Sequence, residues 1–458
     1  MKVVVCGAGQ VGSNIARHLA TEANHVTVID HAPDLVRKIS DSLEVRGIVG
    51  HASHPGVLER AGARDADMLI AVTHSDEVNM VACQVAASLF NVPTKIARVR
   101  SQSYLQPAWA DLFSREKLPI DVIISPEIEV ARAISRRLQV PGAFDNIPLA
   151  EGRVQVIGVR CSEECPILDT PLRQLTELFP DLNIVILAIL RAGQAVLPRG
   201  EERLKAGDDV YFVVDSTQVS RGMAAFGHEE PEAHRIVIVG GGNIGLYLAQ
   251  EIENTHPGVR AKVIEQNKER AEFAAQSLSR SVVIHGSALE VEILEEANAD
   301  AAEAVVAVTN DDEVNILSSL LAKRAGARRA MTLVNNMSYE SLIATLGVDV
   351  VVVPQAITVS TILQHVRRGR IRSVHSLREN LGEVIEAEAL ETSRLIGRAI
   401  KDADLPKGIV IGALIRDERV IIPRLDTVVK AKDRVIMFAR PEAIRAVEKI
   451  FAVSLQFF

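Results

Sequence analysis

The chain opens with Lys2-Val3-Val4-Val5-Cys6, followed directly by Gly7-Ala8-Gly9-Gln10-Val11-Gly12. The apolar run predicts a buried strand. A G-x-G-x-x-G pattern after a strand is a dinucleotide-binding fingerprint when a helix follows and an acidic residue closes the next strand. Apolar residues then recur every four positions, which predicts the helix, and the strand-like run His25–Ile29 ends in Asp30. The first thirty residues therefore predict the start of a Rossmann-type sheet.

Each residue of this fingerprint has a physical role. Gly7 permits the tight turn, Gly9 lets the backbone approach a pyrophosphate, and Gly12 lets the helix pack close to the sheet. The amides at the helix N-terminus and the helix dipole favour phosphate. Asp30 accepts hydrogen bonds from ribose hydroxyls and repels a 2′-phosphate. The alternative is a sheet of this type that has lost its ligand.

Length and composition favour a globular protein of several domains. The chain has 458 residues, of which 48% are hydrophobic but only 3% aromatic, a mixture that suits buried parallel strands. The net charge of −8 argues against nucleic acid as a partner. No apolar run approaches the roughly 18 residues needed to span a bilayer, and the N-terminus shows no signal peptide. We therefore expect a soluble cytoplasmic protein.

The same plan is written twice along the chain. Arg235–Val239 precedes Gly240-Gly241-Gly242-Asn243-Ile244-Gly245, and the strand-like run Ala261–Ile264 ends in Glu265, the counterpart of Asp30. Strands alternating with helices at this rhythm predict a parallel, doubly wound sheet in each copy. A smaller unit of short strands around one helix follows each sheet. The predicted fold is α/β: two doubly wound Rossmann-type parallel sheets, each followed by a small α+β subdomain.

These patterns divide the chain into four predicted domains. Residues 1–126 and 233–354 form the two Rossmann-type units, and residues 127–228 and 355–453 each hold a crossover helix and a small unit. A polar, proline-broken stretch, residues 228–234, reads as the linker between the copies. The apolar stripes of the crossover helices, Val130 to Leu138 and Val359 to Val366, are expected to pack against a partner unit.

The order of units and both fingerprints resemble the TrkA family of Trk-system potassium uptake proteins, which are tandems of RCK domains (regulators of potassium conductance). The resemblance runs along essentially the whole chain. It implies Rossmann nucleotide-binding subdomains followed by C-terminal RCK subdomains. It also implies NAD(H), ATP or ADP as effectors, and an integral-membrane potassium channel-like subunit as the partner. The chain would then lie on the cytoplasmic face of the inner membrane as a homo-oligomer, which we expect to be a tetramer.

In a doubly wound sheet the ligand lies beyond the carboxyl ends of the strands, where the strand order reverses. This rule places the phosphate at the glycine loop, the ribose at the acidic residue and the adenine near the third strand. The candidate nucleotide-binding residues of the first copy are Gly7, Ala8, Gly9, Gln10, Val11, Asp30, His51, Ala52, Thr73 and His74. Those of the second copy are Gly240, Gly241, Gly242, Asn243, Ile244 and Glu265.

The resemblance adds Arg98, at the end of the fifth strand, as a phosphate contact. A guanidinium there could bind a phosphate bidentately; the alternative is an ion pair at the surface or between subunits. In the second copy we match Arg98 with Val334 and Arg100 with Asn336, so the second site should bind phosphate-rich ligands more weakly or bind a different ligand.

Two other patterns have competing interpretations. Thr73 and Ser75 before Asp76-Glu77 also read as an ordinary helix start. His51-x-x-His54 could suggest a metal site, but no cluster of acids or cysteines accompanies it, so we predict no metal.

The function predicted from these residues is regulation by a bound nucleotide, not catalysis. A hydride-transfer enzyme needs a substrate pocket with an acid or base near the nicotinamide, and no substrate-sized insertion supplies one, so we predict no catalytic residues. The alternative is a nicotinamide-dependent oxidoreductase on a duplicated Rossmann scaffold.

Overall fold

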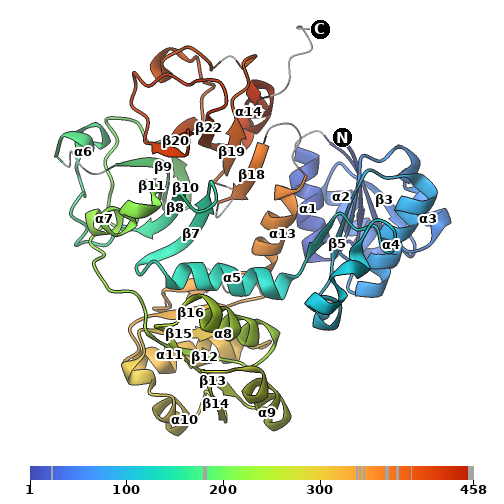
Figure 1. Cartoon of the computed structure of the whole chain (residues 1–458), viewed down its shortest axis with the longest axis horizontal. Helices are drawn as coiled ribbons and strands as arrows, with labels where there is room; N and C mark the ends of the chain where they lie inside the picture. Colours follow the sequence, from blue (N-terminus) through green and yellow to red (C-terminus); the bar gives the residue numbers. More distant parts are fainter. Residues whose placement is uncertain are drawn as a thin grey trace. The chain divides into compact units, whose positions relative to one another are not determined.

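The structure is a computed structural model of the whole chain, shown in Figure 1. It describes residues 1–21, 24–178, 183–336, 339, 342–343, 346–366, 371–377, 381–393 and 395–451. These residues form two compact units, which are described separately below. The first unit holds residues 1–130 and 353–365, and the second holds residues 131–352 and 366–458.

The first unit is built on a six-stranded parallel sheet in the order β3-β2-β1-β4-β5-β6. The order reverses between β1 and β4, which places the ligand-binding edge of a doubly wound sheet at the carboxyl ends of these two strands. Its strands are β1 (Lys2–Cys6), β2 (His25–Asp30), β3 (Arg46–Val49), β4 (Met68–Ala71), β5 (Thr94–Arg98) and β6 (Val122–Ile124).

Helices cover this sheet because each carries one apolar face. In the helix after the fingerprint, Ile15, Ala16 and Leu19 are fully buried, as their spacing predicts. The helices are α1 (Gln10–Thr21), α2 (Pro33–Ser42), α3 (Pro55–Arg60) and α4 (Asp76–Phe90), with short 3-10 helices at Ala63–Asp65, Gln102–Tyr104 and Pro107–Phe113.

The second large sheet, in the second unit, repeats the first strand for strand. Its order is β14-β13-β12-β15-β16-β17, again all parallel. The strands are β12 (Arg235–Val239), β13 (Arg260–Glu265), β14 (Val282–His285), β15 (Ala304–Ala307), β16 (Ala330–Leu333) and β17 (Val350–Val352). The helices around it are α8 (Asn243–Thr255), α9 (Lys268–Ser277), α10 (Val291–Glu296) and α11 (Asp312–Ala325), with a 3-10 turn at Ala299–Ala301.

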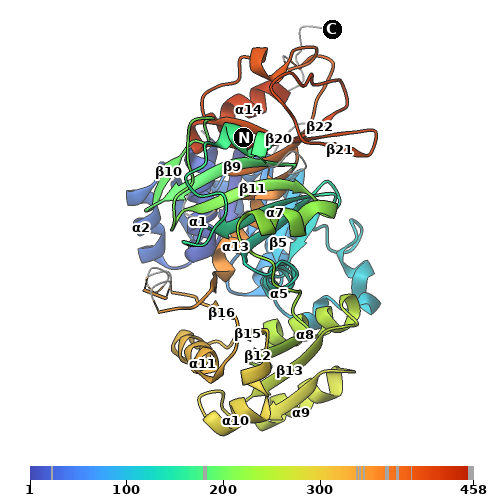
Figure 2. The ribbon, with the colours of Figure 1, turned by 90° about the vertical axis from the view of Figure 1, so that its left-hand side faces the viewer.

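The two crossover helices are α5 (Pro126–Leu138) and α13 (Pro354–Gln364). α13, which comes from the second copy, packs against α1 of the first copy, and Figures 1 and 2 both show these helices together. The apolar stripes of both helices are already buried within a single chain. Their packing against another chain stays a prediction.

Each small unit is a five-stranded antiparallel sheet, in the orders β10-β9-β11-β8-β7 and β18-β19-β22-β20-β21. The first holds β7 (Ala143–Leu149), β8 (Val154–Arg160), β9 (Ile184–Arg191), β10 (Gln194–Val196) and β11 (Asp209–Asp215), with α6 (Leu172–Leu178) and α7 (Val219–Ala225). The second holds β18 (Ile371–Ser376), β19 (Glu383–Glu388), β20 (Ile409–Arg416), β21 (Arg419–Ile421) and β22 (Arg434–Ala439), with α14 (Ile444–Phe451).

Each small sheet contains its own arginine–aspartate ion pair with a buried carboxylate, and the two sheets also contact each other. Arg191 donates from Nε and Nη2 to the two oxygens of Asp208, and Arg416 binds Asp433 in the same way. β9 lies against β20, as Figure 2 shows. Gly412 permits this approach, because a Cβ there would lie 2.7 Å from Leu187. In the part of the chain that the structure describes, no helix is long and apolar enough to cross a membrane.

Candidate functional site

The glycine loop of the first copy has the shape that the fingerprint predicts. Gly7 has a φ of +112°, which favours glycine. A Cβ at position 12 would lie 1.9 Å from the Gly7 carbonyl oxygen, so only glycine lets α1 start this close to β1. A Cβ at Gly9 would meet no atom within 4 Å. The loop is therefore tight on its inner side and open where a pyrophosphate would approach.

Asp30 is fixed beside this loop by two backbone amides. The amide of Ala8 donates to Oδ2 at 2.7 Å, and the amide of Ala32 donates to Oδ1 at 2.9 Å. A carboxylate oxygen accepts more than one hydrogen bond, so each still has lone pairs for a ribose hydroxyl. The carboxylate is held in place before any ligand arrives.

The second copy builds the same arrangement with a longer acid. The amide of Gly241 donates to Oε2 of Glu265 at 2.7 Å, and the amide of Asn267 donates to Oε1 at 2.8 Å. A Cβ at Gly245 would lie 1.9 Å from the Gly240 oxygen, whereas one at Gly242 would meet nothing within 4 Å. The extra methylene of Glu265 leaves the hydrogen-bond pattern unchanged.

Three histidine rings lie next to one another beside Asp30. His51 stacks on His31 with a ring-centroid distance of 5.5 Å, and the ring of His54 lies 5.2 Å from that of His51 at a tilted angle. The His31 Nδ1 lies 3.2 Å from Oδ1 of Asp30. His51 was expected near the adenine, next to the buried Ala52. His31 and His54 were not proposed as ligands, although their positions beside Asp30 and His51 were the available signal.

The end of β4 is organised by Asn79 of α4, a residue that the sequence did not single out as functional. Its Oδ1 accepts from the amide and hydroxyl of Thr73 at 2.8 and 2.7 Å, and its Nδ2 donates to the Arg98 carbonyl at 2.9 Å. Thr309 and Asn315 repeat the pattern in the second copy. Ser75 is the N-cap of α4, as the helix-start interpretation predicts, and His74 is exposed at the loop.

Arg98 lies at this edge of the sheet, and no carboxylate of the described residues forms an ion pair with it. Its Nη2 donates to the Thr73 carbonyl at 2.7 Å, while Nε is buried without a hydrogen-bond partner. Burial, and then the charge of Arg100, lower the pKa of the guanidinium, although the charges of Glu127 and Asp76 oppose the shift. Within the described residues Arg98 forms no ion pair, so the ion-pair alternative finds no support inside one chain. An anion such as a phosphate would supply the missing partner.

The structure corrects the match between the copies at this strand. Asn79 binds the carbonyl of Arg98, whereas Asn315 binds that of Leu333, so Leu333 and not Val334 stands in the place of Arg98. Likewise, Asp76 accepts from the amide of Arg100 and Asp312 from that of Asn335, so the counterpart of Arg100 is Asn335 and not Asn336. The earlier match was wrong by one residue because both strands continue into apolar positions. The second site still has an apolar residue in place of the arginine.

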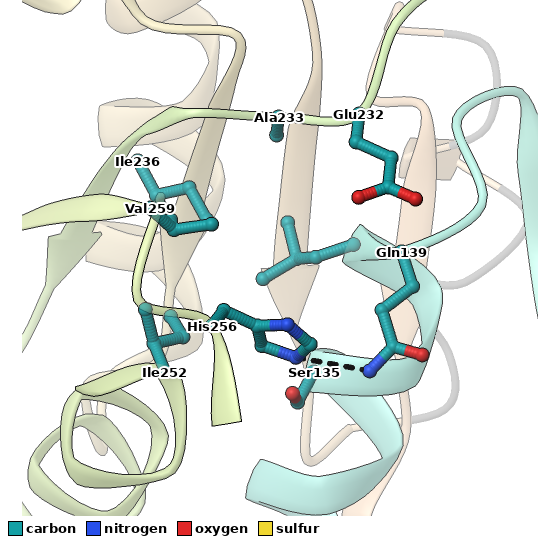
Figure 3. Close-up of a pocket in the computed structure, with 9 residues that line it drawn as sticks. Ser135, Gln139, Glu232, Ala233, Ile236, Ile252, His256 and Val259 are labelled. Carbon is teal, nitrogen blue, oxygen red and sulfur yellow. Dashed lines mark hydrogen bonds between the residues drawn. The ribbon is translucent and has the colours of Figure 1, made fainter. Parts of the chain in front are cut away.

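A small pocket lies at the end of α5. Figure 3 shows that its walls come from α5, the linker and the second Rossmann-type unit, with Gln139 hydrogen-bonded to His256 at 3.0 Å. None of the candidate nucleotide-binding residues lines it. In the described residues no group of three or more His, Cys, Asp or Glu is arranged to hold a metal ion.

Comparison with known proteins identifies the two kinds of unit. The TrkA-N domain family matches residues 3–126 and 236–354, and the TrkA-C domain family matches residues 156–227 and 384–452. The Trk system potassium uptake protein TrkA of Azorhizobium caulinodans is 56% identical over 458 residues and covers 100% of both chains. The proteins of the same name from Halomonas elongata and Vibrio alginolyticus are 44% and 41% identical, over 100% and 99% of both chains.

Solved structures confirm the fold. The GsuK RCK domain superposes with a TM-score of 0.60 at 18% identity, over 98% of this chain and 94% of that one. The GsuK channel bound to NAD gives a TM-score of 0.60 at 19% identity, over 98% and 78%. At these identities the likeness concerns the fold alone, whereas the full-length matches concern ancestry. The chain therefore belongs to the TrkA family of Trk system potassium uptake proteins.

Proposed function

We propose that this chain is the nucleotide-binding regulatory subunit of a Trk-type potassium uptake system. It gates an integral-membrane potassium-translocating subunit in response to NAD(H), ATP or ADP. The observation that carries the proposal is the carboxylate of Asp30, held by two amides beside a glycine loop whose outer side is open. Glu265 repeats it in a chain whose full-length relatives are named for potassium uptake.

The proposed ligand contacts follow from this geometry. The loop residues 7–11 and 240–244 bind phosphate, Asp30 and Glu265 bind ribose, and His51 and Ala52 border the adenine. Thr73, His74 and Arg98 flank the phosphates of the first ligand. The guanidinium of Arg98 supports its role, because its Nε is buried without a hydrogen-bond partner and a phosphate would supply one. The GsuK channel, which shares this fold, is a structure bound to NAD.

The wider assembly is also proposed. The four domains, residues 1–126, 127–228, 233–354 and 355–453, would act on the cytoplasmic face of the inner membrane as a homotetramer. Large apolar side chains are exposed on α4 and α11 and could form contacts between chains: Val81, Leu89 and Leu317 are 45%, 54% and 50% accessible. The relatives are named for potassium uptake and not for hydride transfer, so the chain is a regulatory protein and not an enzyme.

Isothermal titration of the purified chain with NADH, ATP and ADP tests the proposal. Asp30→Ala should lower first-site affinity about tenfold or more, because the ribose loses a charged acceptor. Asp34→Ala, an exposed acid one turn further on, is the control and should change affinity less than about twofold. Potassium uptake in cells that carry the membrane subunit should lose its nucleotide response with Asp30→Ala alone. Unchanged affinity and unchanged uptake in that variant would refute the proposal.

A further inference from the structure

The two nucleotide sites carry their positive charge at different places. In the first site Arg98 lies at the end of β5, two strands from β1 on the far side of the switch point. In the second site the equivalent Leu333 is 2% exposed and apolar. A cation is nonetheless present there. It is Arg270, on the first turn of α9, directly after the strand that ends in Glu265.

Arg270 is held against the glycine loop of the second site. Its Nε donates to the Gly241 carbonyl at 2.8 Å, and its Nη2 donates to Oδ1 of Asn243 at 3.1 Å. Its guanidinium lies 4.9 Å from the ring centroid of Phe273. Within the described residues it forms no ion pair with a carboxylate. The guanidinium therefore borders the loop with its charge free.

The first copy satisfies the same loop carbonyl without any charge. There the hydroxyl of Ser13 donates to the Ala8 carbonyl at 2.8 Å, and the residue equivalent to Arg270 is Leu35. In the second copy the residue equivalent to Ser13 is Leu246, which has no hydroxyl. A hydroxyl is enough to satisfy a carbonyl. An arginine adds a charge and several further N–H donors.

The position of this charge indicates which phosphate it meets. Gly241 donates its amide to Glu265, the ribose acid, and accepts Arg270 at its carbonyl. The guanidinium is thus one peptide away from the Glu265 contact, on the β13 side of the switch point, whereas Arg98 lies on the β5 side of its own sheet. Phe273 covers one face of the guanidinium, which limits its motion and favours a defined hydrogen-bonding direction.

We propose that Arg270 is the phosphate-binding residue of the second site, and that this site takes a short adenosine nucleotide such as ADP, whose phosphates begin next to the ribose. The first site, with Arg98 on the far side, takes a ligand that extends further, such as ATP or NADH. This inference rests on the proposed function, because it assumes that both loops bind nucleotide.

Titration of one site at a time tests the inference. Gly9→Val should silence the first site and Gly242→Val the second; neither position has an atom within 4 Å of an added Cβ, and circular dichroism of both variants checks that the fold is kept. In the Gly9→Val chain, Arg270→Leu should lower ADP affinity about 10- to 100-fold, the range for a charge-assisted hydrogen bond. In the Gly242→Val chain the same change should alter affinity less than about twofold, while Arg98→Leu should lower ATP affinity there and leave the second site unchanged.

A double variant separates ligand binding from support of the loop. Arg270→Leu with Leu246→Ser restores the hydroxyl of the first copy without the charge. ADP affinity should stay low; its return to the value of the Gly9→Val chain would show that Arg270 only holds the loop and would overturn the inference. Nucleotide binding by the Gly242→Val chain but not by the Gly9→Val chain would refute the inference and leave the proposed function standing. Binding by neither chain would refute both.

Discussion

At the scale of single residues, the carboxylates and guanidinium groups fall into two classes: those with hydrogen-bonding capacity left for a ligand, and those whose capacity is used within the fold. Asp30, Glu265 and Arg98 have hydrogen-bonding capacity left over and lie at the edge where a ligand binds. Asp208 and Asp433 are buried, and each accepts hydrogen bonds from an arginine and from a backbone amide within its small sheet. The sequence predicted the first acids from their spacing after the glycines. It did not predict Arg270, because an arginine on an exposed helix turn looks like an ordinary surface residue until its contact with Gly241 is seen.

His375, on β18, should make stability depend on pH. Burial, and then the charge of Arg136, lower its pKa to about 4, although Asp145 opposes the shift. In the unfolded chain the ring therefore binds a proton near pH 6.5, whereas in the folded chain it binds one only at lower pH. Stability is complete above about pH 6.5 and falls until about pH 4. Because the ring is only half-buried, the loss by pH 5 should be about 1 kcal/mol.

The measurement is urea unfolding at pH 7.5 and pH 5.0. His375→Gln should lose less stability between these values than the unchanged chain does, by about 1 kcal/mol. His234→Gln is the control, since that ring is exposed in the linker and stays in water in both states. Equal losses in the His375→Gln chain and the unchanged chain would contradict the assignment.

At the scale of elements, the sequence predicted the strands of the large sheets, but it missed strands of the small sheets. β1, α1 and β2 followed from an apolar run, helical spacing and a closing acid. β7 and β18 were not predicted, because Ala143–Leu149 contains Asp, Asn and Pro and Ile371–Ser376 mixes Arg, Ser and His, so neither alternates cleanly. These strands exist because they pair with β8 and β19. Pairing between segments is invisible to local periodicity.

The glycines of the first loop should separate folding from binding. Gly12→Ala places a methyl group 1.9 Å from a backbone oxygen that cannot move without displacing β1, so it should cost about 3 kcal/mol or more. Gly9→Ala meets open space and should change stability by less than about 0.5 kcal/mol. It should still lower nucleotide affinity roughly tenfold, because the methyl group stands where the pyrophosphate approaches. Thermal unfolding and titration of both variants check this; equal stability of the two would refute the close α1–β1 approach.

At the scale of the whole molecule, a buried carboxylate joins the two small sheets. Glu386 accepts from Arg434 Nε at 2.8 Å and from the Ala150 amide at 3.1 Å, and Arg434 also donates to Glu151 at 2.6 Å. Ala150 and Glu151 belong to the first small unit and have left-handed φ values of 51° and 54°, so the contact is made with a fixed turn. The repeat alone did not predict this, because the residue equivalent to Glu386 in the first copy is Gly158.

Removing this charge should loosen the pair of small sheets. Glu386→Gln leaves Arg434 without its buried partner and should cost about 3 kcal/mol, as expected for breaking a buried ion pair. Glu388→Gln, on the same strand, is the matched control: Glu388 pairs with the exposed Arg372, and its loss should cost less than about 1 kcal/mol. Chemical unfolding of both variants measures the difference, and similar costs would mean that the contact with Ala150 contributes little.

A hydrogen bond connects the first glycine loop to a helix of the second copy. The Gln355 side chain, at the start of α13, donates to Gln10 in the glycine loop, and the chain runs on from α13 into the second small unit. A ligand that moves Gln10 on binding would therefore change the support of α13. The energy of this contact couples ligand binding at the first loop to the position of α13. Weakening the contact should therefore reduce the coupling and leave nucleotide binding nearly intact. One hydrogen bond supports a coupling factor of about 2- to 10-fold.

We expect Gln355→Ala to keep first-site affinity within about twofold, while the nucleotide response of potassium uptake falls by that factor. Gln364→Ala, at the other end of the same helix, should change neither; an unaltered response in Gln355→Ala would place the coupling path elsewhere.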